Sequence, residues 1–190
     1  MENTGLLALN YPERIETARL VLRRAVAADA PELFERCTSD PEVTRFLLWP
    51  AHQNVEQTRE RITRPLTGTE VEFQSWLMTR KSGGAIVGSI GCRRIENHVI
   101  QFGYYVAKAE WGNGYATETT SALVPVWLSH PEIWRVQAFC DPENVASARV
   151  LAKSGLTLEG TLRRYIFSPN LGPDPRDGYL FAAVKSSEIT

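Results

Sequence analysis

The sequence predicts a single α/β domain built around a mixed β-sheet, and three observations lead to this fold class. The chain has 190 residues, which suits one domain of ordinary size. Apolar residues make up 43% and charged residues 23%, so disorder, a collagen-like chain and a coiled coil are excluded. Hairpin-like β segments come first, and alternating strands and helices follow. We expect the domain to span residues 16–185, between an N-terminal extension (1–15) and a short tail (186–190).

Charge and cysteine usage narrow the classes of partner. Lys and Arg number 21 against 22 Asp and Glu, so a net charge of −1 offers no general attraction for nucleic acid or anionic lipid. Cys37, Cys92 and Cys140 match no paired metal-ligand spacing, and the three histidines are scattered, so we predict no metal site. No apolar run reaches the roughly 18 residues of a membrane span. We expect a cytoplasmic protein with reduced thiols, and the sequence leaves a homodimer open.

The N-terminal half carries the signals of one strand and two short helices. Alternating apolar residues predict the strand. Asp29 is the expected N-cap of the first helix, and Asn54 with Gln57 repeats the capping signal for the second. No clear pattern marks residues 39–53. The expected elements are a strand over 19–23 and helices over 32–37 and 55–62.

The C-terminal half predicts a hairpin followed by strand–helix units. Residues 81–84, Lys-Ser-Gly-Gly, have the composition of a tight turn between two β-rich runs. Pro125 falls inside a helical pattern, where we expect it to kink the helix or end it early. A second helix is expected to stop at Gly155. The expected strands cover 73–79, 85–95, 99–106, 134–140, 158–167 and 179–184, and the helices cover 116–128 and 145–154.

One short segment between a strand and a helix carries the main functional signal. It reads Trp-Gly-Asn-Gly-Tyr-Ala-Thr from Trp111 to Thr117. Glycines let successive backbone N–H groups point into one concavity, and the N-terminus of the following helix adds partial positive charge. Such a turn binds phosphate, although the same composition also suits a plain tight turn.

Two common nucleotide-binding motifs do not fit this segment. A Walker A loop requires Gly-Lys-Ser or Gly-Lys-Thr, whereas Tyr115 and Ala116 follow Gly114 here. A Rossmann fingerprint would place glycine at Thr117 and would follow the first strand of the sheet. A dinucleotide-dependent oxidoreductase, with Asp141 on the ribose, is therefore a weak alternative.

The chain resembles the GNAT superfamily of acetyl-CoA-dependent N-acetyltransferases over about residues 16–184. Trp111 to Ala116 matches the phosphate-binding signature Gln/Arg-x-x-Gly-x-Gly/Ala, with Trp in the first place. The wider set of motifs is similar to the RimJ/RimL branch, which acetylates N-termini of ribosomal proteins. The segments that carry this resemblance are Phe102–Val106 (Phe-Gly-Tyr-Tyr-Val), Glu110–Glu118, Asp141–Ser147 and Gly155.

The resemblance implies a splayed central sheet flanked by helices. Strands 99–106 and 134–140 would separate to admit the pantetheine arm of acetyl-CoA, whose amides would pair with the open edge near Tyr105 and Val106. Asn144 and Ser147 would face this arm near its sulfur, or else serve only as helix caps. The backbone N–H groups of residues 112–116 would hold the pyrophosphate. The implied cofactor-binding residues are Tyr105, Val106, Trp111, Gly112, Asn113, Gly114, Tyr115, Ala116, Thr117, Asn144 and Ser147.

The resemblance also implies catalytic roles, from which the chain departs at two positions. Ser147 would protonate the leaving thiolate, and the backbone N–H of Val106 would stabilise the oxyanion. Leu151 stands where many members carry Tyr. Gln101 stands where the branch commonly has Glu, so the general base is unassigned. The residues that would act as bases through water are Glu72, Asp141, Glu159 and His98.

The missing base favours an acceptor that is already partly uncharged at neutral pH. A peptide α-amine, with a pKa of roughly 7.7 to 8.0, meets this condition better than a lysine near ~10.4. We therefore predict an enzyme that transfers acetyl from acetyl-CoA to a protein or peptide N-terminus, a ribosomal one included. A small-molecule amine (polyamine, amino acid or antibiotic) and a non-catalytic acyl-CoA-binding module are the alternatives. Acceptor contacts are expected from residues 39–72 and from Trp76.

Overall fold

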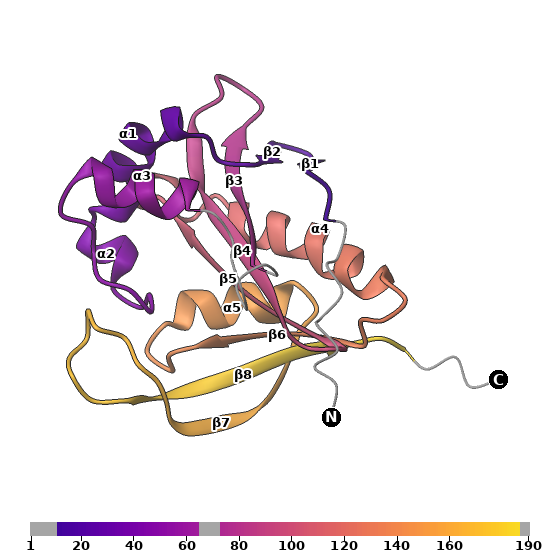
Figure 1. Cartoon of the computed structure of the whole chain (residues 1–190). Helices are drawn as coiled ribbons and strands as arrows, with labels where there is room; N and C mark the ends of the chain where they lie inside the picture. Colours follow the sequence, from indigo (N-terminus) through magenta and orange to yellow (C-terminus); the bar gives the residue numbers. More distant parts are fainter. Residues whose placement is uncertain (1–10, 65–72, 187–190) are drawn as a thin grey trace, which may run out of the picture.

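The fold is organised around one eight-stranded mixed sheet (Figure 1), in the order β1-β2-β3-β4-β5-β6-β8-β7. The computed structural model describes residues 11–64 and 73–186. Every neighbouring pair is antiparallel except β5 and β6, which run parallel. The strands are β1 (Arg14–Glu16), β2 (Leu20–Arg23), β3 (Gln74–Arg80), β4 (Ile86–Glu96), β5 (Val99–Val106), β6 (Arg135–Cys140), β7 (Thr157–Ile166) and β8 (Arg176–Val184).

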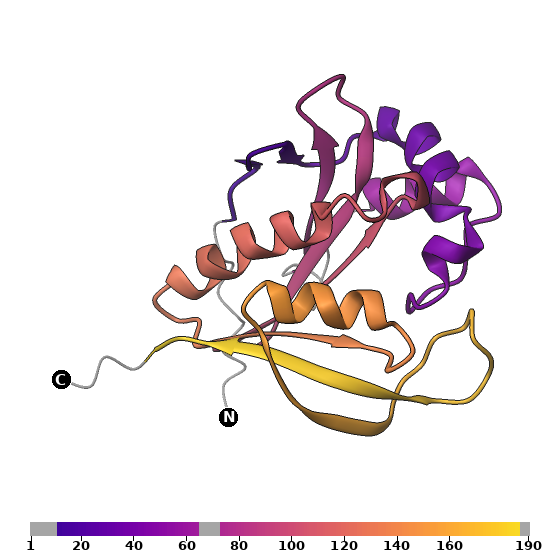
Figure 2. The same ribbon diagram turned by 180° about the vertical axis from the view of Figure 1, so that it is seen from behind.

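Helices cover the two faces of the sheet unequally. In Figure 2, α4 and α5 lie in front of the sheet, whereas α1 to α3 gather near β3 to β5 on the opposite face. The longer helices are α3 (Val55–Thr63), α4 (Tyr115–Ser129) and α5 (Val145–Lys153). The short ones are η1 (Ala27–Asp29), α1 (Ala30–Leu33), the π-helical η2 (Phe34–Thr38), α2 (Pro41–Thr44) and η4 (Lys108–Glu110).

The core consists of two clusters, one on each face, because side chains alternate along each strand. On β3, Trp76 and Met78 belong to the cluster that includes Trp127 of α4 and Leu151 of α5. Leu77, between them, belongs to the smaller cluster around α1 and η2. The two faces of β3 therefore contact different helices, with α4 and α5 on one face and α1 to α3 on the other.

The predicted strands and the long helices are present, with shifted boundaries. The strand expected over 179–184 begins earlier, at Arg176, and β1 was not predicted. Of the two outcomes expected for Pro125, an early end does not occur, since α4 continues to Ser129. The first-turn signal of α2 was missed: Asp40 precedes Pro41, and its carboxylate accepts from the Glu42 N–H at 2.8 Å.

Asp29 occupies the predicted N-cap position of the first helix, α1, but without the side-chain capping bond that was expected. Asp29 is the last residue of η1, and its side chain makes no capping bond to α1. Its carboxylate instead accepts from the Val26 N–H at 2.7 Å and pairs with the Arg23 guanidinium at 2.7 and 2.8 Å. The helical segment starts at Ala27, the first residue of η1, rather than near residue 32, and Asp29 contributes to the capping box of η1.

Two further features concern the cysteines and the length of the helices. Cys37, Cys92 and Cys140 are buried and unpaired. Within residues 11–64 and 73–186, no helix is long and apolar enough to cross a membrane.

Candidate functional site

The parallel strands β5 and β6 part from each other halfway along their length. Their only register pairs join Val99 to Arg135, Ile100 to Val136, and Gln101 to Gln137. Beyond these pairs β5 continues along β4 to Val106, while β6 continues along β8 to Cys140. The edges over 102–106 and 138–140 therefore face each other without a ladder, which confirms the predicted splay.

The chain that leaves β5 forms a turn whose geometry suits an anion. Gly112 and Gly114 have φ of +77° and +78°, in the left-handed region that glycine occupies without strain. Gly114 is the N-cap of α4, and no side chain caps that end of the helix. The first-turn N–H groups of α4 are thus available to an anionic ligand. The indole N–H of Trp111 donates to the Val106 carbonyl at 2.8 Å, which fixes this turn against the end of β5.

The turn carries no basic side chain of its own, and Arg19 supplies one from the start of β2. Residues 111–117 contain no Lys or Arg. The Arg19 guanidinium lies 4.5 Å from the ring centroid of Tyr115. Its Nη2 is 3.8 Å from the position that a Cβ would take at Gly114. Arg19 therefore places positive charge beside the glycine turn.

Glu118, in the first turns of α4, holds Arg19 in this position. The carboxylate accepts from Arg19 Nε at 2.7 Å and from the Arg19 backbone N–H at 2.8 Å, and also from the Thr17 hydroxyl at 2.5 Å. Burial opposes ionisation of Glu118, but these hydrogen bonds outweigh it and lower the pKa of the carboxyl. The Glu118 carboxyl is therefore ionised at neutral pH.

The first turn of α5 lies across the splay from this loop and contacts β5. Asn144 Oδ1 accepts from the Ser147 N–H at 3.1 Å, so Asn144 caps the helix. The Ser147 hydroxyl lies 2.9 Å from the hydroxyl of Tyr104. Leu151 is fully buried in the core. Sequence reasoning missed Tyr104, whose only signal was its place within the quoted Phe-Gly-Tyr-Tyr-Val motif.

The opposite face of β5 carries an aromatic group around Tyr105. The ring of Trp49 meets Tyr105 edge-on, with centroids 5.9 Å apart, and lies 4.9 Å from the ring of His52. The Arg61 guanidinium covers Trp49 at 4.4 Å. His52 Nδ1 lies 2.8 Å from the Thr58 hydroxyl, and burial lowers the pKa of this imidazole. Residues 39–53, which have no sequence pattern, therefore place the rings of Trp49 and His52 beside Tyr105, at the edge of the splay.

Asn170, between β7 and β8, fixes that segment in place. Its Nδ2 donates to the carbonyls of Thr44 and Trp49 at 2.8 and 2.9 Å, and its Oδ1 accepts from the Ala51 N–H at 3.3 Å. The Ser168 hydroxyl reaches two further carbonyls of the same segment, those of Arg45 and Leu47. We call this set of contacts the Asn170 clamp.

Comparison with known proteins assigns the family. The sequence pattern of the "Acetyltransferase (GNAT) domain" matches residues 19–157. An uncharacterized N-acetyltransferase of Bacillus subtilis, YoaA, is 30% identical over 177 residues, which cover 92% of this chain and 98% of YoaA. The chain belongs to the GNAT acetyltransferase family. It is therefore an acyltransferase, and GNAT enzymes use acetyl-CoA.

Solved GNAT structures share this fold with different stated ligands. RimL, an α-N-protein acetyltransferase of a ribosomal protein solved with coenzyme A, has a TM-score of 0.77 and 22% identity; the match covers 90% of this chain and 98% of RimL. The microcin self-immunity acetyltransferase MccE, solved with acetyl-CoA and AMP, has a TM-score of 0.78 and 19% identity, with 92% and 97% covered. At these identities the likeness shows the GNAT fold alone.

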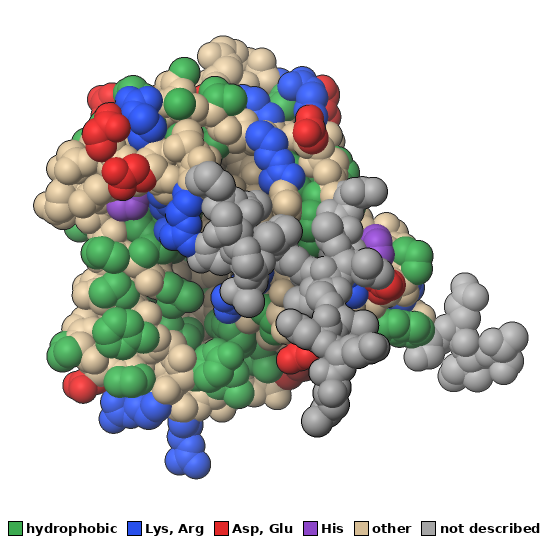
Figure 3. Space-filling view, in the orientation of Figure 1, with side chains coloured by type: hydrophobic (Ala, Val, Ile, Leu, Met, Phe, Trp, Pro, Cys, Tyr) green, Lys and Arg blue, Asp and Glu red, His purple; other side chains and the backbone are tan. Residues whose placement is uncertain are grey.

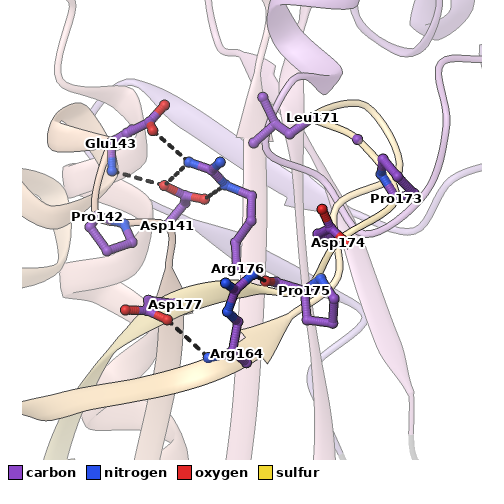
Figure 4. Close-up of a pocket in the computed structure, with 11 residues that line it drawn as sticks. Asp141, Pro142, Glu143, Arg164, Leu171, Pro173, Asp174, Pro175, Arg176 and Asp177 are labelled. Carbon is purple, nitrogen blue, oxygen red and sulfur yellow. Dashed lines mark hydrogen bonds and ion pairs between the residues drawn. The ribbon is translucent and has the colours of Figure 1, made fainter.

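A cavity of about 530 Å³ lies beside the start of α5 in this GNAT domain (Figure 4). Arg176 spans its wall, with Nε 2.5 Å from Asp141 and Nη2 2.6 Å from Glu143. Burial opposes ionisation of Asp141, yet Arg176 and the Glu143 backbone N–H outweigh it and lower the pKa of this carboxyl. Among the described residues, no cluster of His, Cys, Asp or Glu side chains is placed to hold a metal ion.

The base candidates named from the sequence do not share one location in the GNAT domain. His98 is exposed in the β4–β5 turn, at the end of β5 remote from the splay. Glu159 on β7 pairs with Arg135, and Asp141 pairs with Arg176. Glu72 lies outside the described residues. Both paired carboxylates have lowered pKa values, which weakens them as proton acceptors.

The structure does not support Trp76 as an acceptor contact. Its side chain is 1% exposed, and its indole N–H donates to the Pro12 carbonyl at 2.8 Å. Tyr11 packs edge-on against it. Trp76 points toward the α4 face of the sheet, away from the aromatic group around Tyr105. Trp49 is the tryptophan that lies beside the splay.

Proposed function

We propose that this GNAT enzyme transfers the acetyl group of acetyl-CoA directly to the N-terminal α-amine of a protein or peptide. The observation that carries the proposal is the splay itself, which has a distinct surface at each of its two openings. One opening presents an uncapped helix end, two left-handed glycines and Arg19. The other presents the aromatic group around Tyr105.

Acetyl-CoA would enter from the opening beside α4. The N–H groups of residues 112–116 would hold the diphosphate, with Arg19 neutralising part of its charge. Pantetheine would pair with the unladdered edge of β5 at Tyr105 and Val106. The remaining cofactor contacts would come from the turn and from the start of α5: Trp111, Asn113, Tyr115, Ala116, Thr117, Asn144 and Ser147. Direct transfer is favoured because the three thiols are buried, and burial raises the pKa of Cys37 to about 12 and of Cys140 to about 11.

The acceptor would approach across the face of the sheet that lies opposite α4 and α5. This face is open and apolar. Figure 3 shows hydrophobic side chains gathered over β7, β8 and the chain between them. Leu48, Tyr165 and Phe167 are 63%, 55% and 52% exposed. An extended polypeptide needs such an open surface behind its first residue, whereas a small amine is better bound in an enclosed pocket. The Val106 N–H would stabilise the oxyanion, and Ser147 would donate to the leaving sulfur.

A small cationic amine is the second candidate, and the Arg176 cavity is the observation that favours it. Asp174 and Asp177 line this cavity together with Asp141 and Glu143. Four carboxylates against two arginines would attract a polyamine. The cavity lies next to the first turn of α5, where the acetyl group would be delivered.

Thiol release from acetyl-CoA across matched acceptors tests the proposal. We expect turnover with peptides that have a free N-terminus, none with the same peptides blocked by N-acetylation, and little with spermidine, amino acids or aminoglycosides. Turnover confined to lysine side chains or to small amines would contradict the proposed acceptor. If calorimetry shows that acetyl-CoA binds, but no acceptor leads to thiol release from it, the protein is a non-catalytic binding module instead.

A further inference from the structure

Two hydroxyl groups meet at the splay, one from β5 and one from α5. Tyr104 lies three residues beyond the last residue of β5 that pairs with β6. Its hydroxyl is 2.9 Å from Ser147 Oγ and 3.4 Å from the Ser147 carbonyl oxygen. Side chains from the two elements that border the splay are thus joined at the position proposed for the cofactor sulfur.

The partner of the Ser147 hydroxyl differs from those of Thr120 and Ser154 in the same helices. Thr120 in α4 donates to the Ala116 carbonyl at 2.7 Å, and Ser154 at the end of α5 donates to the Val150 carbonyl at 2.8 Å. Both follow the usual habit of helical Ser and Thr, which bond back to the carbonyl four residues earlier. The Ser147 hydroxyl is instead held from outside the helix by Tyr104.

We propose that Tyr104 is a positioning residue that keeps the Ser147 hydroxyl proton directed at the departing sulfur of acetyl-CoA. A serine hydroxyl has one proton to donate and two lone pairs that accept. With Tyr104 as the donor of the 2.9 Å contact, one lone pair of the Ser147 hydroxyl is occupied and its proton is left for another acceptor, the sulfur. This inference rests on the proposed acetyl transfer and adds a residue to it.

The phenol of Tyr104 is suited to donating. Burial raises the pKa of Tyr104 well above its ordinary range, so the group keeps its proton at every pH at which the enzyme would work. The phenol also comes from β5 rather than from α5, where Leu151 occupies the place at which many relatives of this chain carry Tyr. Tyr104 therefore stabilises the leaving group indirectly, through Ser147.

The reaction balances without a proton from Tyr104. The amine nitrogen bonds to the thioester carbonyl carbon, the C–S bond breaks, and its electron pair goes to sulfur. Ser147 donates a hydrogen bond to sulfur as negative charge develops there. The proton lost by the amine ends on the thiol through water, so both hydroxyl groups finish as they began.

A double-mutant cycle on thiol release tests the inference. We expect Tyr104→Phe to lower kcat about tenfold with the KM for acetyl-CoA unchanged, and Ser147→Ala to lower it by a similar factor. The double variant should be no slower than Ser147→Ala, because Tyr104 acts only through Ser147. Additive losses, or a rise in the KM for acetyl-CoA that explains the whole defect, would show a structural role and overturn the inference.

Controls separate this result from general damage and from failure of the proposed function. Tyr179→Phe, on β8, removes a phenol hydroxyl elsewhere and should leave kcat unchanged. Should Tyr104→Phe not fold, 3-fluorotyrosine at position 104 keeps the ring and strengthens the donor, and kcat should rise about twofold; an unchanged kcat would count against the inference. If the wild type releases thiol with any amine or with water as acceptor, and Tyr104→Phe shows no defect, only this inference is contradicted. No release by the wild type would sink the proposed transfer as well.

Discussion

The two openings of the splay are built in different ways. The opening proposed for acetyl-CoA is formed largely by consecutive chain: β5 ends at Val106, the glycine turn follows, and α4 begins at Tyr115. The opening proposed for the acceptor depends on the Asn170 clamp, whose hydrogen bonds join residues 119 to 126 positions apart. Local backbone geometry therefore defines one side, and long-range tertiary contacts define the other. Mutations should affect the two substrates separately.

The largest expected effect comes from the backbone of the glycine turn. Gly112→Ala forces a residue with a Cβ into φ of +77°, which costs about 1–2 kcal/mol. The turn can escape this strain only by rotating its N–H groups away from the proposed diphosphate. We expect acetyl-CoA affinity, measured by calorimetry, to fall at least tenfold.

Gly83→Ala provides a matched control for that substitution. Gly83, in the turn after β3, has φ of +78°, and like Gly112 it has no atom within 4 Å of a built Cβ. Both variants should lose a similar free energy of unfolding, about 1 kcal/mol. Only Gly112→Ala should bind acetyl-CoA more weakly. Equal affinities in the two variants would remove the glycine turn from the cofactor site.

The same contrast explains how much the sequence could predict. The glycine turn and the Asn144 cap follow from short-range rules, and both appear in the structure as expected. Trp49 could not be placed, because residues 39–53 have no periodic pattern and are ordered by hydrogen bonds from Asn170, over a hundred residues later. Asp29 stands at the predicted N-cap position of α1, but its carboxylate bonds to the Val26 N–H and to Arg23 rather than to that helix.

The Asn170 clamp provides the next largest effect, on the acceptor side. Asn170→Ala removes three hydrogen bonds that hold the segment carrying Trp49. We expect the KM for a peptide acceptor to rise about tenfold while the KM for acetyl-CoA stays unchanged. The free energy of unfolding should fall by about 1–3 kcal/mol, because backbone carbonyls lose their hydrogen-bond partner.

Asn97→Ala is the corresponding control. Asn97 is exposed in the β4–β5 turn, at the end of the sheet away from the splay. It should change neither KM nor the free energy of unfolding measurably. A parallel rise in both KM values for Asn170→Ala would show that the clamp supports the whole splay rather than the acceptor side.

Arg19 tests the electrostatic part of the cofactor opening, where a smaller effect is expected. Arg19→Ala removes the basic side chain that lies against the turn, and we expect acetyl-CoA to bind about fivefold more weakly at low salt. The difference should shrink as ionic strength rises, because salt screens exposed charges. Arg14→Ala is the control: Arg14 is similarly exposed and, like Arg19, pairs with a glutamate, in its case Glu16. Equal affinities in the two variants would contradict a role for Arg19.

The smallest expected effect is the pH dependence that Glu118 gives to the cofactor side. Burial opposes its ionisation, but bonds from Thr17 and Arg19 prevail, so its pKa in the folded chain lies below the unfolded value near 4.5. Such a group adds stability above the unfolded pKa and loses it as pH falls through the folded pKa. Urea unfolding should show Glu118→Gln about 1 kcal/mol less stable at pH 7, with the difference shrinking as pH falls below 4.5. Glu16→Gln, at an exposed ion pair, should show no measurable difference at any pH. A Glu118→Gln deficit that does not shrink as pH falls below 4.5 would mean that the charged pair with Arg19 does not hold the first turns of α4 to β2.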